Sequence, residues 1–353
     1  MAALEDISLS LSLAEHIHEP MMISQLVRYA MVSIQFNATW EALQSDETTE
    51  VQLQQLQLAW EQLQLMPDAD AAMAMERAMG LSELEYARKS YNHLQSVIMG
   101  SSGAAFGGGL NEFVELGKSI MQDPIDGLKA MGSRYPGYWL WCWSWTYDDE
   151  RALIHYWQDY REELRSAEKA SSFAKAIARF ENQMWEFEGV KHEEMNQVHY
   201  LMTKQLTGAG FGFLKRLANI KAQRDMAIAA IALKRFHLQE KKYPAQLEEL
   251  VPRFCKALPR DVFDGKPMRY ALKPDGTFLL YSIGVDGLDN HGDATSAEKT
   301  SRPVWVKGRD LVWPRAATAG EAAAFIKKEI ARAITADPTP TLLTTNQTTT
   351  ANK

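Results

Sequence analysis

The sequence predicts an α+β fold, in which a mainly α-helical N-terminal domain is followed by one long helix and a small antiparallel sheet. Three observations predict this class. Apolar residues recur at helical spacing across residues 20–94. A second helical pattern covers residues 214–240, and Pro244 prevents its continuation. Two β-rich runs, separated by a turn, lie within residues 268–283.

Size and composition limit the classes of function. At 353 residues the chain is long enough for two domains. Its net charge of −7 and its lack of a Lys/Arg-rich block argue against a nucleic-acid binder. No window approaches the roughly 20 apolar residues of a membrane span. The two cysteines, Cys142 and Cys255, would form one disulfide at most.

The N-terminal helical domain is expected to span residues 1–207. Residues 100–110 form a glycine-rich run that predicts a loop, because consecutive glycines lose much backbone entropy on ordering. A phosphate-binding loop would continue with Lys and then Ser or Thr, whereas Leu110 and Asn111 stand there. A glycine-rich hinge at Thr207–Phe213 is expected to end this domain.

A tryptophan-rich segment, WLWCWSW, precedes a helix expected to start near Asp148 or Asp149. A tryptophan at every second position predicts an extended segment with its indoles on one side. One interpretation is a wedge buried between helices, since Trp is mostly buried. The other is a stripe that stacks on sugar rings or forms an interface hot spot. The indoles belong to Trp139, Trp141, Trp143 and Trp145.

The second domain is expected to span residues 208–315. After the long helix, a Tyr-Pro turn leads to a short helix that Pro252 ends. A hairpin follows, with Lys273–Gly276 as its turn. Further strands are expected at Val304–Val306 and Leu311–Trp313. Beyond this domain we expect one amphipathic helix at residues 316–335 and a disordered tail at residues 336–353.

This order of features resembles the C-terminal head of the major pseudopilin of type II secretion systems. The resemblance covers about residues 225–313. It implies a head made of a long helix and a small antiparallel sheet. The residues that carry it are Tyr243-Pro244, Leu247, Leu250, Leu258-Pro259, Asp261, Gly265, Pro267, Tyr270, Tyr281-Ser282, Gly284, Asp286-Gly287 and Asp310.

Two further features bear on this resemblance. Ile23–Arg28 is similar to a segment that accompanies the same head in a group of large bacterial envelope proteins without an assigned activity. A pseudopilin also has a GFTLxE processing site followed by an apolar membrane helix, whereas this chain offers only Gly212–Lys215, and charges follow. We therefore expect a reused head and not a pilin subunit.

An acidic loop follows the strand that contains Tyr281-Ser282. The corresponding loop binds calcium in pseudopilins, so the resemblance implies a calcium site here. Carboxylates, an Asn amide and backbone carbonyls are the oxygen ligands that calcium prefers. The spacing is not that of an EF-hand, and a solvated turn is the alternative. The candidate ligands are Asp286, Asp289, Asn290, Asp293 and Asp310.

Two other kinds of chemistry have weaker sequence patterns. His192 and His199 lie seven residues apart, but HEEMN lacks the second His of an HExxH zinc motif. His16 and His18 form no better pair. No Gly-x-Ser-x-Gly motif is present, so nucleophilic catalysis has no support in the sequence.

These patterns predict a non-enzymatic structural or interaction protein of the bacterial envelope, with calcium as its candidate cofactor. Protein partners in the envelope are expected, and the oligomeric state stays open. The alternative is a hydrolase acting on envelope polysaccharide or peptide, with acid/base groups among Asp148, Asp149 and Glu150 about 5 to 10 Å apart. A carbohydrate-binding module is a third hypothesis. Extracytoplasmic placement would need an upstream signal or anchor; otherwise the chain is expected in the cytoplasm.

Overall fold

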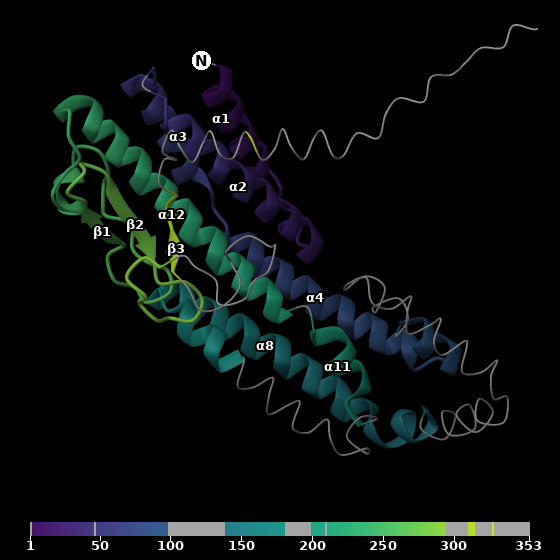
Figure 1. Cartoon of the computed structure of the whole chain (residues 1–353). Coiled ribbons are helices and arrows are strands. Elements are labelled where there is room, and N and C mark those ends of the chain that lie inside the picture. Colours follow the sequence, from purple (N-terminus) through teal and green to yellow (C-terminus); the bar gives the residue numbers. More distant parts are fainter. Residues whose placement is uncertain are drawn as a thin grey trace, which may run out of the picture. The chain divides into compact units, whose positions relative to one another are not determined.

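The computed structural model describes residues 2–45, 47–97, 138–180, 199–208, 210–293, 310–314 and 327. It divides the chain into a unit from Met1 to Trp313 and a second unit from Pro314 to Lys353. Helices dominate the first unit, and a small antiparallel sheet accompanies them (Figure 1). The predicted α+β class is therefore confirmed.

Four helices cover residues 2–87 of the N-terminal region, as the apolar periodicity predicts. Thr49 and Gln52 form a capping box that fixes the start of the third helix. The fully buried Arg28 ties three of these helices together, because it pairs with Glu15 and Asp68 at 2.6 Å each. The helices are α1 (Ala2–Glu15), α2 (Met22–Leu43), α3 (Glu50–Gln62) and α4 (Met66–Ala87).

Helices α8 (Thr146–Ala170) and α11 (Leu201–Thr207) pack beside each other, and α8 also packs on α4. The next helix, α12 (Gly210–Glu240), begins four residues before the predicted start at Leu214. Five of the seven residues of the predicted hinge at Thr207–Phe213 are therefore helical. Gly210 allows this start, because a Cβ there would lie 2.9 Å from the Tyr156 hydroxyl oxygen.

Helix α12 is the shared core element of the first unit. It packs against α2 and α3 on the N-terminal side and against β2 of the sheet. Arg235 joins these parts: its guanidinium donates to Glu50 and Gln57 of α3 and to the Phe254 carbonyl. Gln57 donates to the same carbonyl at 2.9 Å. The N-terminal helical region and the region around the sheet therefore share one buried junction.

The sheet has three antiparallel strands in the order β1-β2-β3. The predicted hairpin is confirmed: Arg269 lies opposite Tyr281, and Leu272 lies opposite Phe278. Strand β3 pairs with the end of β2, with Ser282 opposite Leu311. The strands are β1 (Arg269–Leu272), β2 (Phe278–Ser282) and β3 (Leu311–Val312), and a short 3-10 helix, η3 (Leu247–Leu250), stands where the short helix is expected.

Several predicted segments lie outside the described residues. They are the glycine-rich loop at 100–110, the strand at 304–306, most of the helix at 316–335 and the tail at 336–353. The domain boundary between residues 207 and 208 stays a prediction, and the described residues on both sides of it belong to one compact unit. Within the described part of the chain, no helix has the length and hydropathy needed to cross a membrane.

Candidate functional site

The predicted calcium loop starts where β2 ends and is closed by the residue before β3. Glycines allow its turns, because Gly284, Gly287 and Gly292 have positive φ angles. The pairing of β2 with β3 brings Asp310 back to this loop. Its backbone N–H donates to the Asp293 carbonyl at 3.2 Å. The structure thus places Asp310 and Asp293 together, as the resemblance implies.

Asp310 is fully buried and holds the loop through its carboxylate. One oxygen accepts from the Asn290 N–H at 3.2 Å, and the other accepts from the Gly292 N–H at 2.6 Å. Burial raises the pKa of Asp310, these hydrogen bonds oppose the rise, and the charges of Asp289 and Asp286 add to it. Negative charge is therefore concentrated where the resemblance implies a cation.

The other candidate ligands have their own partners. Asp289 accepts from the Tyr281 hydroxyl at 3.1 Å and from the His291 N–H at 3.0 Å. Its second oxygen lies 3.5 Å from Arg269. The hydrogen bond from His291, with smaller contributions from Tyr281 and Arg269, lowers the pKa of Asp289. Asp286 accepts from the Leu288 N–H at 3.1 Å, as in an ordinary Asx turn.

Calcium would need six to eight oxygen ligands. Among the described residues, no group of three or more His, Cys, Asp or Glu side chains is placed to hold a metal ion. The described side chains alone therefore do not make a complete calcium site. Any full ligand set would have to include atoms from outside the described residues or from backbone carbonyls.

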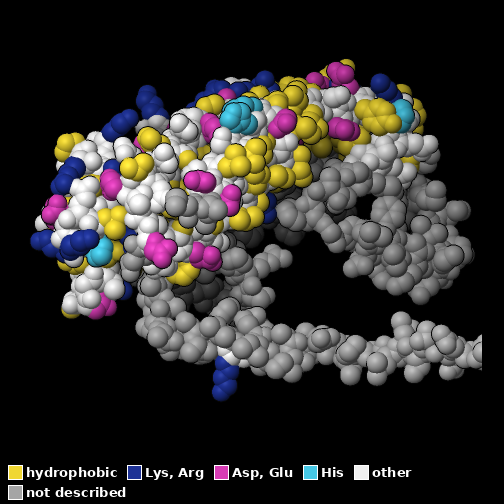
Figure 2. All heavy atoms as spheres, turned by 90° about the horizontal axis from the view of Figure 1, so that it is seen from above, with side chains coloured by type: hydrophobic (Ala, Val, Ile, Leu, Met, Phe, Trp, Pro, Cys, Tyr) yellow, Lys and Arg dark blue, Asp and Glu magenta, His cyan; other side chains and the backbone are white. Residues whose placement is uncertain are grey.

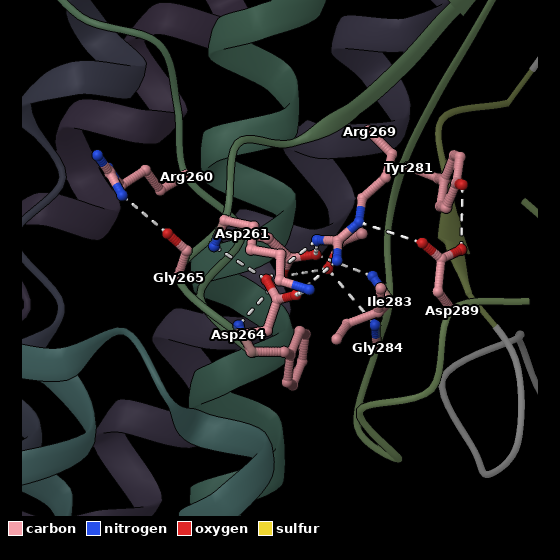
Figure 3. A network of polar contacts seen from close by, with 12 residues as sticks. Arg260, Asp261, Asp264, Gly265, Arg269, Tyr281, Ile283, Gly284 and Asp289 are labelled. Carbon is pink, nitrogen blue, oxygen red and sulfur yellow. Dashed lines mark hydrogen bonds and ion pairs between the residues drawn. The ribbon is translucent and has the colours of Figure 1, made fainter. Parts of the chain in front are cut away.

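A second polar cluster lies next to this loop and was missed in the sequence. Arg269 of β1 pairs with Asp261 at 2.8 Å and with Asp264 at 2.5 Å. Figure 3 shows its guanidinium directed toward these two carboxylates, with Asp289 on its other side. Burial would raise the pKa of Asp264, but the hydrogen bond from Arg269 lowers it overall.

Asp261 is the centre of this Asp261–Arg269 cluster. Its fully buried carboxylate accepts from the Phe263 N–H, the Ser282 hydroxyl and the Ile283 N–H, at 2.8 to 3.0 Å. Burial raises its pKa, and these bonds together with Arg269 oppose the rise. Asp261 belongs to the residues that carry the resemblance, whereas Arg269 occupies an unspecified position of that pattern. Only the paired geometry of β1 and β2 reveals its role.

The prediction of an extended tryptophan segment is wrong. Residues 138–140 are α-helical, and the π-helix η1 (Trp141–Trp145) continues directly into α8. In a helix, residues two apart point to different sides, so the four indoles do not share a face. Trp141 is fully buried, whereas Trp143 is 84% exposed. The interpretation as a buried wedge therefore holds for Trp141 and fails for Trp143.

A buried hydrogen bond joins the start of this helical stretch to α8. The Trp141 indole N–H donates to Asp149, eight residues further along, at 2.8 Å. Asp149 also accepts from the Met202 N–H, the Thr203 N–H and the Thr203 hydroxyl, at 2.7 to 2.9 Å. This buried carboxylate thus caps the first turn of α11.

The exposed tryptophans form a shallow apolar depression. Trp139, Leu140, Trp143 and Ser144 line it. The Trp139 and Trp143 rings are 6.2 Å apart and inclined at 79°. Coplanar stacking on one sugar face is therefore not available to this pair. Trp145 instead stacks on His199, with ring centroids 5.1 Å apart.

The candidate acid/base carboxylates do not converge. Asp148 pairs with Arg151 at 3.0 Å and lies 3.4 Å from His199. Glu150 pairs with Arg88 at 2.5 Å. Asp149 is buried and accepts a hydrogen bond from the Trp141 indole N–H. His192 lies outside the described residues, so the zinc hypothesis stays a prediction. Both cysteines are free thiols.

Comparison with protein families, curated proteins and solved structures finds no match to this chain.

Proposed function

We propose that this chain is a non-enzymatic structural or interaction protein of the bacterial envelope, with a pseudopilin-like head. One observation carries the proposal: each carboxylate of the hydrolase hypothesis already has a partner within the chain. Asp149 holds α11 and Trp141, while Asp148 and Glu150 form ion pairs with arginines. An acid/base pair needs two carboxyl groups facing one bond, with one of them free to exchange a proton.

The arrangement of the head supports the second half of the proposal. A long helix leads through the turn at Tyr243-Pro244 to η3 and a three-stranded antiparallel sheet. The Tyr270 hydroxyl donates to the Pro244 carbonyl at 2.7 Å, which joins two residues of the resemblance. The matched residue Asp261 lies at the centre of the buried cluster.

Cell fractionation tests the proposed placement. The full chain, tagged at its natural locus, is expected in the envelope fraction and is expected to resist removal by buffer alone. A chain found wholly with cytoplasmic marker proteins would contradict the proposal. The enzyme alternative is tested by incubating purified protein with envelope polysaccharide and peptide, where release of products that Asp148→Ala and Glu150→Ala abolish would favour it.

Calcium remains a proposal for the acidic loop. A bound cation would offset the mutual repulsion of Asp286, Asp289 and Asp310 and would stabilise the folded state by mass action. Calcium is expected to raise the melting temperature of the wild type above its value in chelator. Asp286→Ala/Asp310→Ala is expected to abolish the difference, and Asp275→Ala, in the hairpin turn, is the control. An identical melting temperature with calcium and chelator would refute the site.

Carbohydrate binding is the second candidate, because Trp139 and Trp143 expose indole surface on either side of a depression. Stacking on sugars would have to use the two rings separately, given their 79° inclination. A glycan array is expected to show a ligand that Trp143→Ala loses and that Tyr86→Ala, a control elsewhere on the surface, retains. An array without any ligand would remove this candidate.

A further inference from the structure

Helices α1 and α2 present an apolar face to solvent. Ile23, Val27 and Ile34 are 61%, 53% and 62% exposed, and Ala30 is exposed between them. On the neighbouring α1, Leu9 and Leu13 are 61% and 57% exposed. We call these six residues the α1–α2 outer face. Figure 2 shows hydrophobic side chains gathered along one described face of the molecule.

Helix α2 differs from an ordinary surface helix on its exposed side. Its buried side contains Gln25, Arg28 and Thr39, all fully buried, beside apolar residues. Its exposed side carries branched aliphatic residues where a surface helix normally carries charges. Single exposed apolar residues need no explanation, but an aligned row of them is typical of an interaction site.

The spacing of the exposed apolar residues of α2 indicates what kind of surface they would pack against. Ile23, Val27, Ala30 and Ile34 follow one another at intervals of four, three and four residues. This is the a/d spacing with which one helix packs along another. The second row, Leu9 and Leu13, lies on the helix that runs beside α2, as the Gln35 to Ser10 hydrogen bond shows. Two such rows provide the hydrophobic seam for one further helix.

The charges around this face select the partner. Arg28 is the only Lys or Arg between residues 2 and 76, and it is buried against Glu15 and Asp68. Glu5, Asp6 and Glu41 are exposed. Since Ser10 lies against Gln35 and α1 runs antiparallel to α2, these three acids lie toward the same end of the face. A second copy docked with its helices parallel to these would bring like charges together, and in either orientation it would offer them no cation, whereas Lys or Arg would complement them.

We propose that the α1–α2 outer face docks an amphipathic helix of a partner protein, with an apolar a/d seam flanked by Lys or Arg. The proposal deepens the interaction role proposed above and rests on it. The apolar rows provide the contact area, and the acidic residues set the preference for a basic partner.

Peptide binding to the purified full chain tests this docking. The probe is a fluorescein-labelled peptide of about four heptads, with Leu at a and d and Lys at e and g. A matched peptide carries Glu at e and g. Fluorescence anisotropy is expected to show at least ~10-fold tighter binding of the Lys peptide, and weaker binding as salt rises to about 300 mM.

Variants locate the binding. Ile23→Gln/Ile34→Gln, and separately Val27→Gln, are expected to weaken Lys-peptide binding by about 10-fold, with unchanged circular dichroism. Leu288→Gln is the matched control, since Leu288 is 64% exposed in the head. Equal binding of both peptides, or binding that the α2 variants do not change, would overturn the docking proposal. A wild-type dimer that Ile23→Gln/Ile34→Gln converts to monomer would also overturn it, in favour of a second copy.

The outcomes separate this inference from the proposed function. A chain that fractionates with the envelope but binds neither peptide would refute the docking face and leave the envelope role standing. A cytoplasmic chain that binds the Lys peptide through α2 would refute the envelope placement and support the docking face.

Discussion

Two fully buried aspartates, one in the helical region and one in the head, are stabilised in different ways. Asp149 accepts hydrogen bonds from the Trp141 indole, the Met202 and Thr203 N–H groups and the Thr203 hydroxyl, all of them neutral donors. Asp261 accepts similar neutral bonds but also pairs with Arg269 at 2.8 Å. Both carboxylates hold segments together that are distant in sequence.

The comparison shows two solutions to the same problem, the cost of burying an ionised carboxyl group. The first turn of α11 supplies Asp149 with oriented N–H groups and a favourable helix dipole. The head supplies Asp261 with a guanidinium, which Asp264 shares. Removal of one partner should therefore have different consequences in the two regions.

The largest effect is expected from Asp149→Ala. This change leaves the Trp141 indole N–H and two backbone N–H groups buried without an acceptor, and each such group costs about 1 to 3 kcal/mol. The free energy of unfolding is expected to fall by about 4 kcal/mol in urea titrations. Asp148→Ala, on the partly exposed neighbour, is the control and should change it by less than about 1 kcal/mol. Equal losses for the two variants would refute the role assigned to Asp149.

A smaller and pH-dependent effect is expected from Arg269→Gln. Loss of the guanidinium leaves Asp261 buried without a cation, which costs about 3 kcal/mol near neutral pH. Burial already raises the pKa of Asp261, and it rises further in the variant. The loss should therefore become smaller as the pH falls, because protonation of Asp261 removes the buried charge.

Two variants complete that measurement. Arg260→Gln removes a neighbouring arginine whose exposed guanidinium donates to the Gly265 carbonyl, and it should leave stability nearly unchanged. Asp149→Ala should show no comparable recovery at low pH, because its orphaned groups are neutral donors. A pH-independent loss in Arg269→Gln would contradict the ion-pair account of the head.

A third effect, seen only as a difference between pH values, concerns Asp225 of α12, the helix that both regions share. Burial raises its pKa to about 6, against the opposing influence of Arg224 and Lys221. A raised pKa stabilises the fold at pH values below 3.8, the ordinary pKa of Asp. That contribution is lost as the pH rises through about 6. Between pH 4 and pH 7 the wild type should lose up to about 3 kcal/mol more than Asp225→Asn. Parallel profiles of stability against pH for the two proteins would show that the pKa of Asp225 is not raised.

The elements of the head were predictable from the sequence because local signals agree. Pro244 ends the long helix, and Lys273–Gly276 marks the hairpin, so α12, β1 and β2 follow from turn chemistry and periodicity. The Trp segment was not predictable in this way. Its alternation suggested a strand, whereas the segment is helical, and no local pattern shows the bond that Trp141 makes with Asp149.

The candidate sites show the same limit. Asp310 was expected at the acidic loop and lies there, since the resemblance names it and β3 returns it to the loop. Arg269 was missed, because its importance arises from three carboxylates that long-range strand pairing brings around it. The α1–α2 outer face was also missed, because periodicity shows a helix's apolar side but not which side the fold buries.

The central claim is that the helical region and the head form one cooperative unit through α12 and the Arg235 junction. Native-state hydrogen exchange of Arg269→Gln tests it most directly, because this change lies in the head alone. Amides of α2, α3 and α12 are expected to lose protection by the same factor as those of β1 and β2, about 100-fold for 3 kcal/mol. Loss of protection confined to residues 241–293 would contradict the claim.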